Sequence, residues 1–530
     1  MQSTDVFIYD TTLRDGSQGE NINFSANEKL RIAHRLDEMG FHYIEGGWPG
    51  SNPKDDHFFR MAKEQPLKNS RLVAFGSTRK PHVRTEKCAN IQSLLDAGTQ
   101  AIALFGKSWE LHVTEILAIS LEENLEMIAD SVSYFKKRDK EVIFEAEHFF
   151  DGYRLRPDYA LSTVKTALDA GAEWIALCDT NGGTMPHDLA KAIREAAKII
   201  PKEKLAIHAH NDCGMAIANT IAAVNEGATM AQGTINGYGE RCGNADLIPI
   251  IANLQLKMGL RCLPDSSIKQ LTNLSYYVGE VANIRPLPFR PYVGRSAFAH
   301  KGGVHVSAVA KSSRAYQHIQ PELVGNRQRV LVSELSGKSN ISYKAKEMGV
   351  SLGNDEALTK KIVREIKILE EKGFQFDAAE GSLSVLMKKL TGAFREPFKL
   401  QSFTVTNIKT KDDPSLCQAT IKISVGDKEE LTAAEGNGPV NALDNALRKA
   451  LTKFYPEISD IQLVDFKVRI TEGIEGTAAR VKVLFDTRDK DEMWSTIGVS
   501  ENIIEASWQA LVDSIYYKLS KSKSETDDKG

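Results

Sequence analysis

The chain lacks the features that mark membrane-spanning, secreted and nucleic-acid-binding proteins. No segment holds about 18 uninterrupted apolar residues, the length that a transmembrane helix needs. The first twenty residues have neither the basic start nor the apolar run of a signal peptide. A net charge of -3 with 26% charged residues argues against general binding to nucleic acid or anionic membranes. We therefore expect a cytoplasmic protein whose partners include no nucleic acid and no membrane.

Closely spaced cysteine pairs are also absent. The six cysteines include no CxxC pair and are scattered over the chain: Cys88, Cys178, Cys213, Cys242, Cys262 and Cys417. This scatter fits reduced thiols better than a disulfide framework or a structural zinc site. The 530 residues, 42% of them hydrophobic, predict one large domain and at least one smaller one.

Short apolar runs recur eight times before residue 265, and amphipathic helical stretches separate them. The runs begin at residues 6, 43, 71, 101, 142, 174, 205 and 230. Strands that alternate with helices predict parallel βα units. Eight such units in about 260 residues predict an α/β fold whose catalytic domain, residues 1–265, is a closed (β/α)₈ TIM barrel.

The pattern changes twice after the barrel. Residues 266–395 contain a Pro-containing stretch, Gly-rich segments and helical segments, so we expect a linker with small helical subdomains. Residues 396–519 hold β-type runs in two similar halves, each with an Ala-rich helix, and predict a duplicated α+β C-terminal domain. Residues 520–530 have no apolar side chain and are expected to form a disordered tail.

Two histidines near the end of the seventh predicted strand suggest a metal site. His208 and His210 are two residues apart, so both imidazoles project from the same face of the strand. Alone, such a pair is more often a buried hydrogen-bonded pair than a ligand pair. Asp15 after the first strand and Asn244 after the eighth would join them in a closed barrel. Nitrogen and oxygen ligands without thiolate suit Mg²⁺, Mn²⁺ or Zn²⁺.

Other polar residues also follow the predicted strands. Arg14 could hydrogen-bond an oxygen on which negative charge develops, or could simply pair with a barrel carboxylate. Glu147 closes the fifth strand and could accept a proton. Glu145 points the same way, so spacing does not decide between the two carboxylates. Thr180 could donate a hydrogen bond to a substrate carboxylate or could serve a plain turn.

Four motifs in the barrel carry a resemblance to known enzymes. They are DTTLRDGSQ at 10–18, CDTNGG at 178–183, HAHNDCGMAIAN at 208–219 and GTINGYGERCGNADL at 233–247. In this order they resemble the signatures of the 2-isopropylmalate, homocitrate and citramalate synthases and the related HMG-CoA lyases. The resemblance implies an acyltransferase that joins acetyl-CoA to a 2-oxo acid. It also implies a divalent metal bound by Asp15, His208, His210 and Asn244, which the 2-oxo acid chelates.

The same resemblance implies roles for further residues. Arg14 would polarise the keto oxygen, Thr180 would hold the substrate carboxylate, and Glu147 would be the acid/base residue. Water would then release CoA by thioester hydrolysis.

Beyond the barrel, FAHKGGVHVSAV at 298–309 is similar to a family motif that is usually closer to HxxGIHxDG. His305 and Tyr316 match a His and a Tyr that the family uses near the reacting centre. Ser307 and Ala308 stand where the family's motif usually has Asp and Gly. His300 remains an alternative to His305.

The C-terminal region and one loop narrow the choice within the family. The duplicated domain resembles the leucine- or isoleucine-sensing domain of isopropylmalate and citramalate synthases. The stretch EGGWPGSNPKDDHFF at 45–59 resembles one branch of the citramalate synthases, which implies pyruvate as the acceptor and a step of isoleucine biosynthesis. The alternative acceptor is 2-oxoisovalerate, which would give 2-isopropylmalate for leucine biosynthesis. Leu104 and Phe105 at a strand end are candidates for setting the size of the acceptor pocket.

The regulatory prediction concerns a homodimer or higher homo-oligomer. We expect isoleucine to bind at a dimer interface of the C-terminal domain, near the glycine turns at Gly436, Gly438 and Gly498. A lyase or carboxyltransferase on the same barrel is disfavoured by this domain and by the lack of a biotin-attachment-like segment. A catalytically dead, amino-acid-sensing protein would require broken metal ligands, and none of the four is broken.

Overall fold

The computed structural model describes residues 5–333, 336–353, 355–409, 411, 416–471 and 479–522. The chain forms two compact units. One comprises Met1–Phe298 with Ile319–Gln328, and the other comprises Ala299–His318 with Arg329–Gly530. Within the described ranges, no helix combines the length and apolar character needed to cross a membrane.

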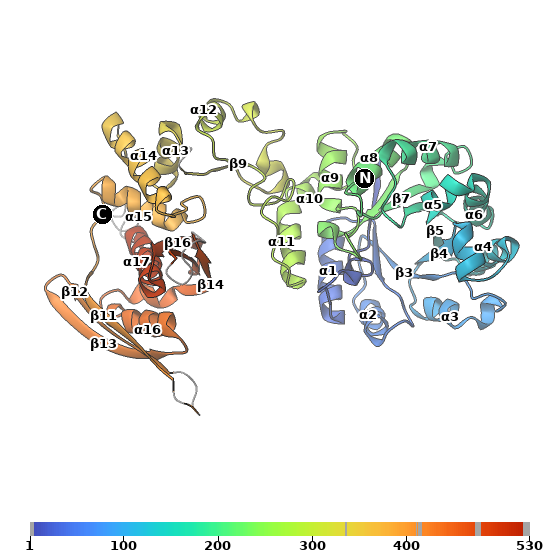
Figure 1. The fold of residues 1–530 in the computed structure, drawn as a ribbon. Coiled ribbons are helices and arrows are strands. Elements are labelled where there is room, and N and C mark those ends of the chain that lie inside the picture. Colours follow the sequence, from blue (N-terminus) through green and yellow to red (C-terminus); the bar gives the residue numbers. More distant parts are fainter. Residues whose placement is uncertain are drawn as a thin grey trace. The chain divides into compact units, whose positions relative to one another are not determined.

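The first unit contains a closed barrel of eight parallel strands in sequence order (Figure 1). The strands are β1 (Phe7–Asp10), β2 (Tyr43–Gly47), β3 (Arg71–Ser77), β4 (Ala101–Lys107), β5 (Glu141–Glu147), β6 (Trp174–Asp179), β7 (Leu205–Ala209) and β8 (Met230–Gly233). Pairing of Phe7 with Met230 and of Asp10 with Gly233 closes the ring between β1 and β8. The predicted TIM barrel is thereby confirmed.

Helices surround the barrel and bury their apolar faces against it. They are α1 (Ala26–Glu38), α2 (Pro53–Glu64), α3 (Ala89–Asp96), α4 (Leu121–Lys136), α5 (Phe149–Leu155), α6 (Pro157–Asp169), α7 (Pro186–Ala196), α8 (Ala216–Asn225) and α9 (Leu247–Leu256). Local signals fix where several begin. Ser25 and Glu28 form a capping box at the start of α1, and the Asn52 side chain caps α2.

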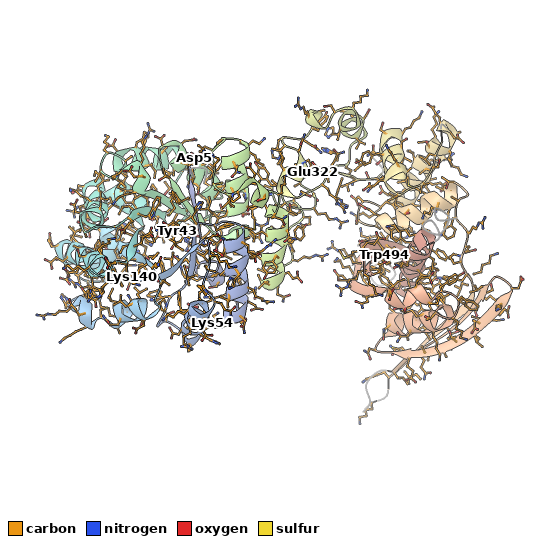
Figure 2. All side chains as sticks on the ribbon, turned by 180° about the vertical axis from the view of Figure 1, so that it is seen from behind. Asp5, Tyr43, Lys54, Lys140, Glu322 and Trp494 are labelled. Carbon is orange, nitrogen blue, oxygen red and sulfur yellow. The ribbon has the colours of Figure 1, made fainter. Side chains whose placement is uncertain are left out.

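Side-chain alternation divides the strand residues into two layers. Outward residues such as Ile8, Ile44 and Ile102 form the main core with the surrounding helices. Inward residues fill the barrel, where the Trp174 indole donates a hydrogen bond to the Tyr43 hydroxyl at 3.1 Å. Figure 2 labels Tyr43 inside the barrel. These side chains fill the barrel interior toward the N-terminal ends of the strands. A pocket within the barrel is therefore expected at the C-terminal ends of the strands.

The segment 266–395 is divided between the two units. Helices α10 (Asp265–Ile268) and α11 (Leu271–Val281) belong to the first unit and contribute Leu271 and Leu274 to its core. The second unit contains β9 (Ala299–His300), α12 (Gly303–Lys311), β10 (Arg329–Val330), α13 (Lys338–Glu347), α14 (Glu356–Glu371) and α15 (Glu380–Leu390). Strands β9 and β10 pair in parallel.

The C-terminal region repeats one arrangement, as predicted. The first copy is β11 (Lys399–Ile408), β12 (Leu416–Val425), β13 (Lys428–Gly436) and α16 (Pro439–Leu451). The second is β14 (Gln462–Ile470), β15 (Val481–Arg488), β16 (Met493–Ser500) and α17 (Ile503–Ser522). Each copy is a three-stranded antiparallel sheet followed by a helix (Figure 1). Side chains of both copies form one apolar core.

Two of the three glycines predicted to lie in turns, Gly436 and Gly498, belong to strands instead. Gly498 lies inside β16, opposite Val483 of β15. A Cβ atom there would lie 1.9 Å from the backbone oxygen of Ala506 in α17. A Cβ atom on Gly436, at the end of β13, would lie 2.3 Å from the backbone nitrogen of Ala442 in α16. Both glycines therefore allow a helix to approach its own sheet closely, so their presence needs no ligand to explain it.

The predicted tail starts too early. Helix α17 continues to Ser522, so residues 520–522 are helical. The rest of the predicted tail, 523–530, lies outside the described residues.

Candidate active site and metal centre

Three buried side chains converge at the C-terminal end of the barrel. Asp15 follows β1, His208 lies in β7 and His210 follows β7 directly. The Nε2 atoms of His208 and His210 lie 3.3 and 3.7 Å from Asp15 Oδ2, and 3.4 Å from each other. One ligand atom from each residue falls within 4.8 Å of the others. The sequence prediction that these three residues meet is correct.

The donor set fits a divalent cation. Asp15 Oδ1 and Asn244 Oδ1 are both buried and have no hydrogen-bond partner. An unpaired buried acceptor is costly unless something else satisfies it. Asn244 is bridged to His210 through the backbone, which places it beside the cluster. Two imidazoles, a carboxylate and an amide oxygen suit Mg²⁺, Mn²⁺ or Zn²⁺.

The charges at this cluster also favour a cation. Burial alone would raise the pKa of Asp15, but Arg14 and His208 outweigh it and hold the pKa well below its usual range. Burial lowers the pKa of His210 to about 4, which keeps its imidazole neutral near pH 7. An ionised carboxylate and a neutral imidazole are the forms that bind metal.

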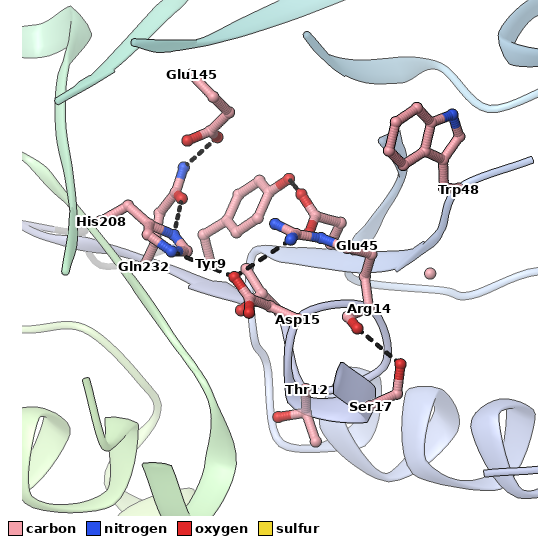
Figure 3. Close-up of polar contacts among 12 residues, drawn as sticks. Tyr9, Thr12, Arg14, Asp15, Ser17, Glu45, Trp48, Glu145, His208 and Gln232 are labelled. Atoms are coloured by element: carbon pink, nitrogen blue, oxygen red, sulfur yellow. Dashed lines mark hydrogen bonds and ion pairs between the residues drawn. The ribbon is translucent and has the colours of Figure 1, made fainter. Parts of the chain in front are cut away.

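A row of hydrogen bonds leads from the cluster into the barrel (Figure 3). His208 Nδ1 lies 2.9 Å from Gln232 Oε1, and Gln232 Nε2 donates to Glu145 Oε1 at 2.7 Å. An amide oxygen can only accept, so the proton of the neutral imidazole sits on Nδ1. The His208 Nε2 lone pair is thereby directed at the cluster.

Arg14 is fixed on several sides (Figure 3). Its Nε donates to Glu45 Oε1 at 2.5 Å, and the other oxygen of Glu45 accepts the Tyr9 hydroxyl at 2.6 Å. Its Nη1 lies 3.2 Å from Asp15 Oδ2, and its guanidinium carbon lies 3.7 Å from the centre of the Phe75 ring. Arg14 therefore pairs with a barrel carboxylate and also lines the pocket.

Thr180 follows β6 and also lines the pocket. Its hydroxyl oxygen accepts the backbone N–H of His148 at 2.8 Å. His148 adopts a left-handed backbone conformation with φ +57°. Because the hydroxyl oxygen is occupied as an acceptor, its proton can be directed to a substrate oxygen.

Both candidate carboxylates of β5 reach the pocket. Glu145 is buried, and burial raises its pKa. Glu147 is more exposed and forms an ion pair with Lys107 at the end of β4. Of the two pocket carboxylates, Glu145 thus accepts a hydrogen bond from Gln232, whereas Glu147 pairs with Lys107 instead.

The pocket is a cavity of about 200 Å³. It is lined by Arg14, Asp15, Gln18, Trp48, Phe75, Phe105, Glu145, Glu147, Cys178, Thr180, His208, His210, Glu240 and Arg241. Phe105 is in this lining as predicted, but Leu104 is not. Successive strand residues point to opposite faces, so Leu104 is fully buried in the outer core between the strands and the helices.

Sequence reasoning missed several residues of the site: Tyr9, Glu45, Trp48, Phe75 and Gln232. A signal for two of them exists in the sequence. Glu45 and Gln232 are polar residues inside apolar strands, and a buried polar group needs a partner. Successive side chains of a strand point to opposite faces of the sheet. Once the residues of a strand that face the barrel interior are known, the inward direction of Glu45 or Gln232 follows.

The second unit contains six of the predicted residues: His300, His305, Tyr316, Gly436, Gly438 and Gly498. The rings of His305 in α12 and Tyr316 stack with their centroids 4.2 Å apart, and both side chains are exposed. His300, the alternative to His305, is buried in β9. Gly438 precedes α16 and has open space around it.

Three protein-family models match consecutive parts of the chain. The model described as HMGL-like matches residues 5–278. The homocitrate synthase post-HMGL domain-like model matches residues 292–373, and the LeuA allosteric (dimerisation) domain matches residues 377–519.

Individual relatives match almost the full length. An (R)-citramalate synthase of Geobacter sulfurreducens is 53% identical over 98% of this chain and 98% of its own. An (R)-citramalate synthase of Aquifex aeolicus is 51% identical over 98% of this chain and 99% of its own. A 2-isopropylmalate synthase of Methanocaldococcus jannaschii is 30% identical over 97% of this chain and 95% of its own. The similarity therefore covers all three parts of the chain.

Proposed function

The chain belongs to the family of (R)-citramalate synthases, and on this premise we propose that it condenses acetyl-CoA with pyruvate and water to give (R)-citramalate and CoA. The observation that carries the proposal is the level of identity over nearly the whole chain. It is 53% to an (R)-citramalate synthase and 30% to a 2-isopropylmalate synthase. The reaction would feed isoleucine biosynthesis from pyruvate.

The acceptor is held by groups that meet at the pocket floor. Asp15, His208, His210 and Asn244 would hold a divalent cation. Such a cation would supply Lewis-acid chemistry at this end of the pocket. Arg14, which Glu45 fixes in place, donates to the keto oxygen of the acceptor and stabilises the negative charge that develops there.

Proton transfer is assigned to Glu147, the pocket carboxylate that takes no part in the hydrogen bonds linking His208, Gln232 and Glu145. The methyl protons of acetyl-CoA are weakly acidic, so a positioned base must assist their removal. Glu145 is engaged with Gln232, whereas Glu147 lies in the pocket lining with Lys107 fixing its position. We therefore assign the acid/base role to Glu147 and the substrate carboxylate to Thr180. His305 and Tyr316 keep the catalytic roles implied by the family motif.

The direct test is release of the free CoA thiol by purified protein supplied with Mn²⁺ or Mg²⁺. Pyruvate, 2-oxoisovalerate and 2-oxoglutarate are compared at equal concentration. A preference for pyruvate supports the proposal. A preference for 2-oxoisovalerate would assign the protein to the alternative, 2-isopropylmalate synthesis, and turnover with none of the three would overturn both.

The regulatory part of the proposal is a homodimer that responds to isoleucine. The match to an allosteric dimerisation domain supports it. So does strand β14, an edge strand that exposes apolar side chains: Leu463, Val464, Phe466, Val468 and Ile470. An exposed apolar edge strand is unfavourable unless another surface covers it.

Two measurements test this regulation. Light scattering should give a dimer for the full chain and a smaller species for Phe466→Asp. Isoleucine should inhibit the full chain but not a chain that ends before residue 396. Inhibition that survives the truncation would refute the assignment of the effector site.

A further inference from the structure

Trp48 is the first aromatic residue of the pocket wall. It follows β2 directly, and its indole packs edge-on against Phe75 and Phe105 with ring centroids 5.8 and 5.4 Å away. Phe75 and Phe105 are themselves stacked at 5.2 Å. The three rings form an apolar wall that is continuous with Arg14, because the guanidinium group lies over the Phe75 ring.

The indole is fixed at its far end by a hydrogen bond. Trp48 Nε1 donates to Asn90 Oδ1 at 2.8 Å. Asn90 in α3 is itself held, because its Nδ2 donates to the backbone oxygen of Ser77 at 2.7 Å. The ring therefore cannot swing away from the pocket without breaking a partly buried hydrogen bond.

The backbone of the same residue is fixed by a buried ion pair. Trp48 N–H donates to Asp55 Oδ2 at 3.0 Å, and Asp55 pairs with Lys29. Lys29, only 1% exposed, also donates to the backbone oxygen of Gly46 at 3.1 Å. Gly47 has φ +152°, and a Cβ atom there would lie 2.6 Å from the Asp55 carboxylate. The loop that carries Trp48 is thus held on both sides.

From this arrangement we propose that Trp48 is a specificity-determining residue that limits the size of the side chain on the 2-oxo acid. Asn90, Lys29 and Asp55 act as positioning residues for its indole. This inference rests on the proposed function, because Arg14 at the end of the wall is assigned to the keto oxygen. A methyl group next to that oxygen can lie against the wall, whereas a branched side chain collides with a ring that is held at both ends.

The test is the ratio of kcat/KM for 2-oxoisovalerate to kcat/KM for pyruvate. In Trp48→Leu we expect this ratio to rise at least about 10-fold, within the range that one or two methylene groups account for in an apolar pocket. The KM for pyruvate should rise more than kcat falls, since the wall contacts the substrate and not the transferred proton. Asn90→Ala should shift the ratio in the same direction by less.

Matched variants separate specificity from folding. Trp174→Phe removes another hydrogen-bonded indole at the opposite end of the barrel, and should leave the ratio unchanged. Trp48→Phe should shift the ratio less than Trp48→Leu. If Trp48→Leu does not fold by circular dichroism, Trp48→Phe and Asn90→Ala decide the question.

Two outcomes are distinguishable. An unchanged ratio in folded variants that still consume pyruvate overturns the role of Trp48 and leaves the proposed function intact. A wild-type protein that releases no CoA with pyruvate overturns the proposed function itself.

Discussion

His208 donates its Nδ1 proton to Gln232 across 2.9 Å, and this single contact sets which face of the imidazole carries a lone pair. The lone pair then points toward Asp15, where the cation is expected. A residue that never touches the cation therefore controls one of its ligands.

Replacing Gln232 should weaken metal binding. Gln232→Leu removes the acceptor of the His208 proton and leaves Glu145 without its amide donor. We expect the affinity for Mn²⁺ to fall about 10- to 100-fold, measured by isothermal titration calorimetry. Gln401→Leu removes an exposed glutamine that is hydrogen-bonded to Glu429 and should leave the affinity unchanged. Equal affinities for the wild type and Gln232→Leu would contradict the role of Gln232.

Arg14→Lys should be far from conservative. Lysine retains the positive charge but loses the directed hydrogen bond to Glu45 and the stacking on Phe75. We expect kcat to fall about 100- to 1,000-fold, as for loss of one donor to a developing oxyanion. CoA release under saturating pyruvate measures it, and unaltered Mn²⁺ affinity would show that the loss is not one of metal binding. A drop in kcat of less than a factor of ten would exclude the assigned role.

Acid should destabilise the fold through His42. Burial lowers the pKa of His42 to about 4, and its Nδ1 accepts the backbone N–H of Ile8 at 3.0 Å. The unfolded chain binds this proton near pH 6.5, so the stability gained from a neutral His42 is present above that pH and is lost as the pH falls toward 4. The contribution is on the order of 3 kcal/mol.

His42→Asn isolates this effect, because its Oδ1 can accept the same N–H without titrating near neutral pH. Denaturant unfolding at pH 4.5 and pH 7.5 should show a smaller pH dependence in the variant. If the wild type and His42→Asn lost the same free energy of unfolding on acidification, His42 would not be the group responsible.

Gly498→Ala should destabilise the C-terminal domain. Its Cβ atom would clash with the backbone oxygen of Ala506, which forces α17 away from β16. We expect a loss of about 1 to 3 kcal/mol, seen as a lower midpoint of chemical or thermal unfolding. Gly438→Ala is the control, because no atom lies within 4 Å of the added carbon. Equal midpoints for the two variants would refute the close approach.

The residues that the sequence placed correctly are those whose position depends on strand order alone. Asp15 follows β1, and His208 and His210 lie at the end of β7, which only β8 separates from β1 in the ring. Eight alternating units are enough to predict that ring. The prediction that Leu104 lines the pocket was wrong, because the side chains of neighbouring strand residues point in opposite directions. The correct parity requires knowing which of two neighbouring apolar residues faces inward.

Tertiary contacts explain the remaining differences. In the sequence, Gly498 resembles a turn residue. In the structure, glycine is required there because the backbone of α17, eight residues further along the chain, lies too close for a Cβ atom. The role of Asn90 in holding Trp48 depends on α3 packing beside β3. Neither the spacing nor the residue type of Asn90 indicates that contact.

The order of the ligands along the chain links metal binding to the completion of folding. Asp15 follows the first strand, whereas His208 and His210 belong to the seventh and Asn244 follows the eighth. A ribosome must therefore synthesise nearly the whole barrel before the four ligands can meet, and they meet only when β1 has paired with β8. In a refolding experiment, the rate at which the protein binds Mn²⁺ should consequently report the rate at which β1 pairs with β8 and closes the barrel.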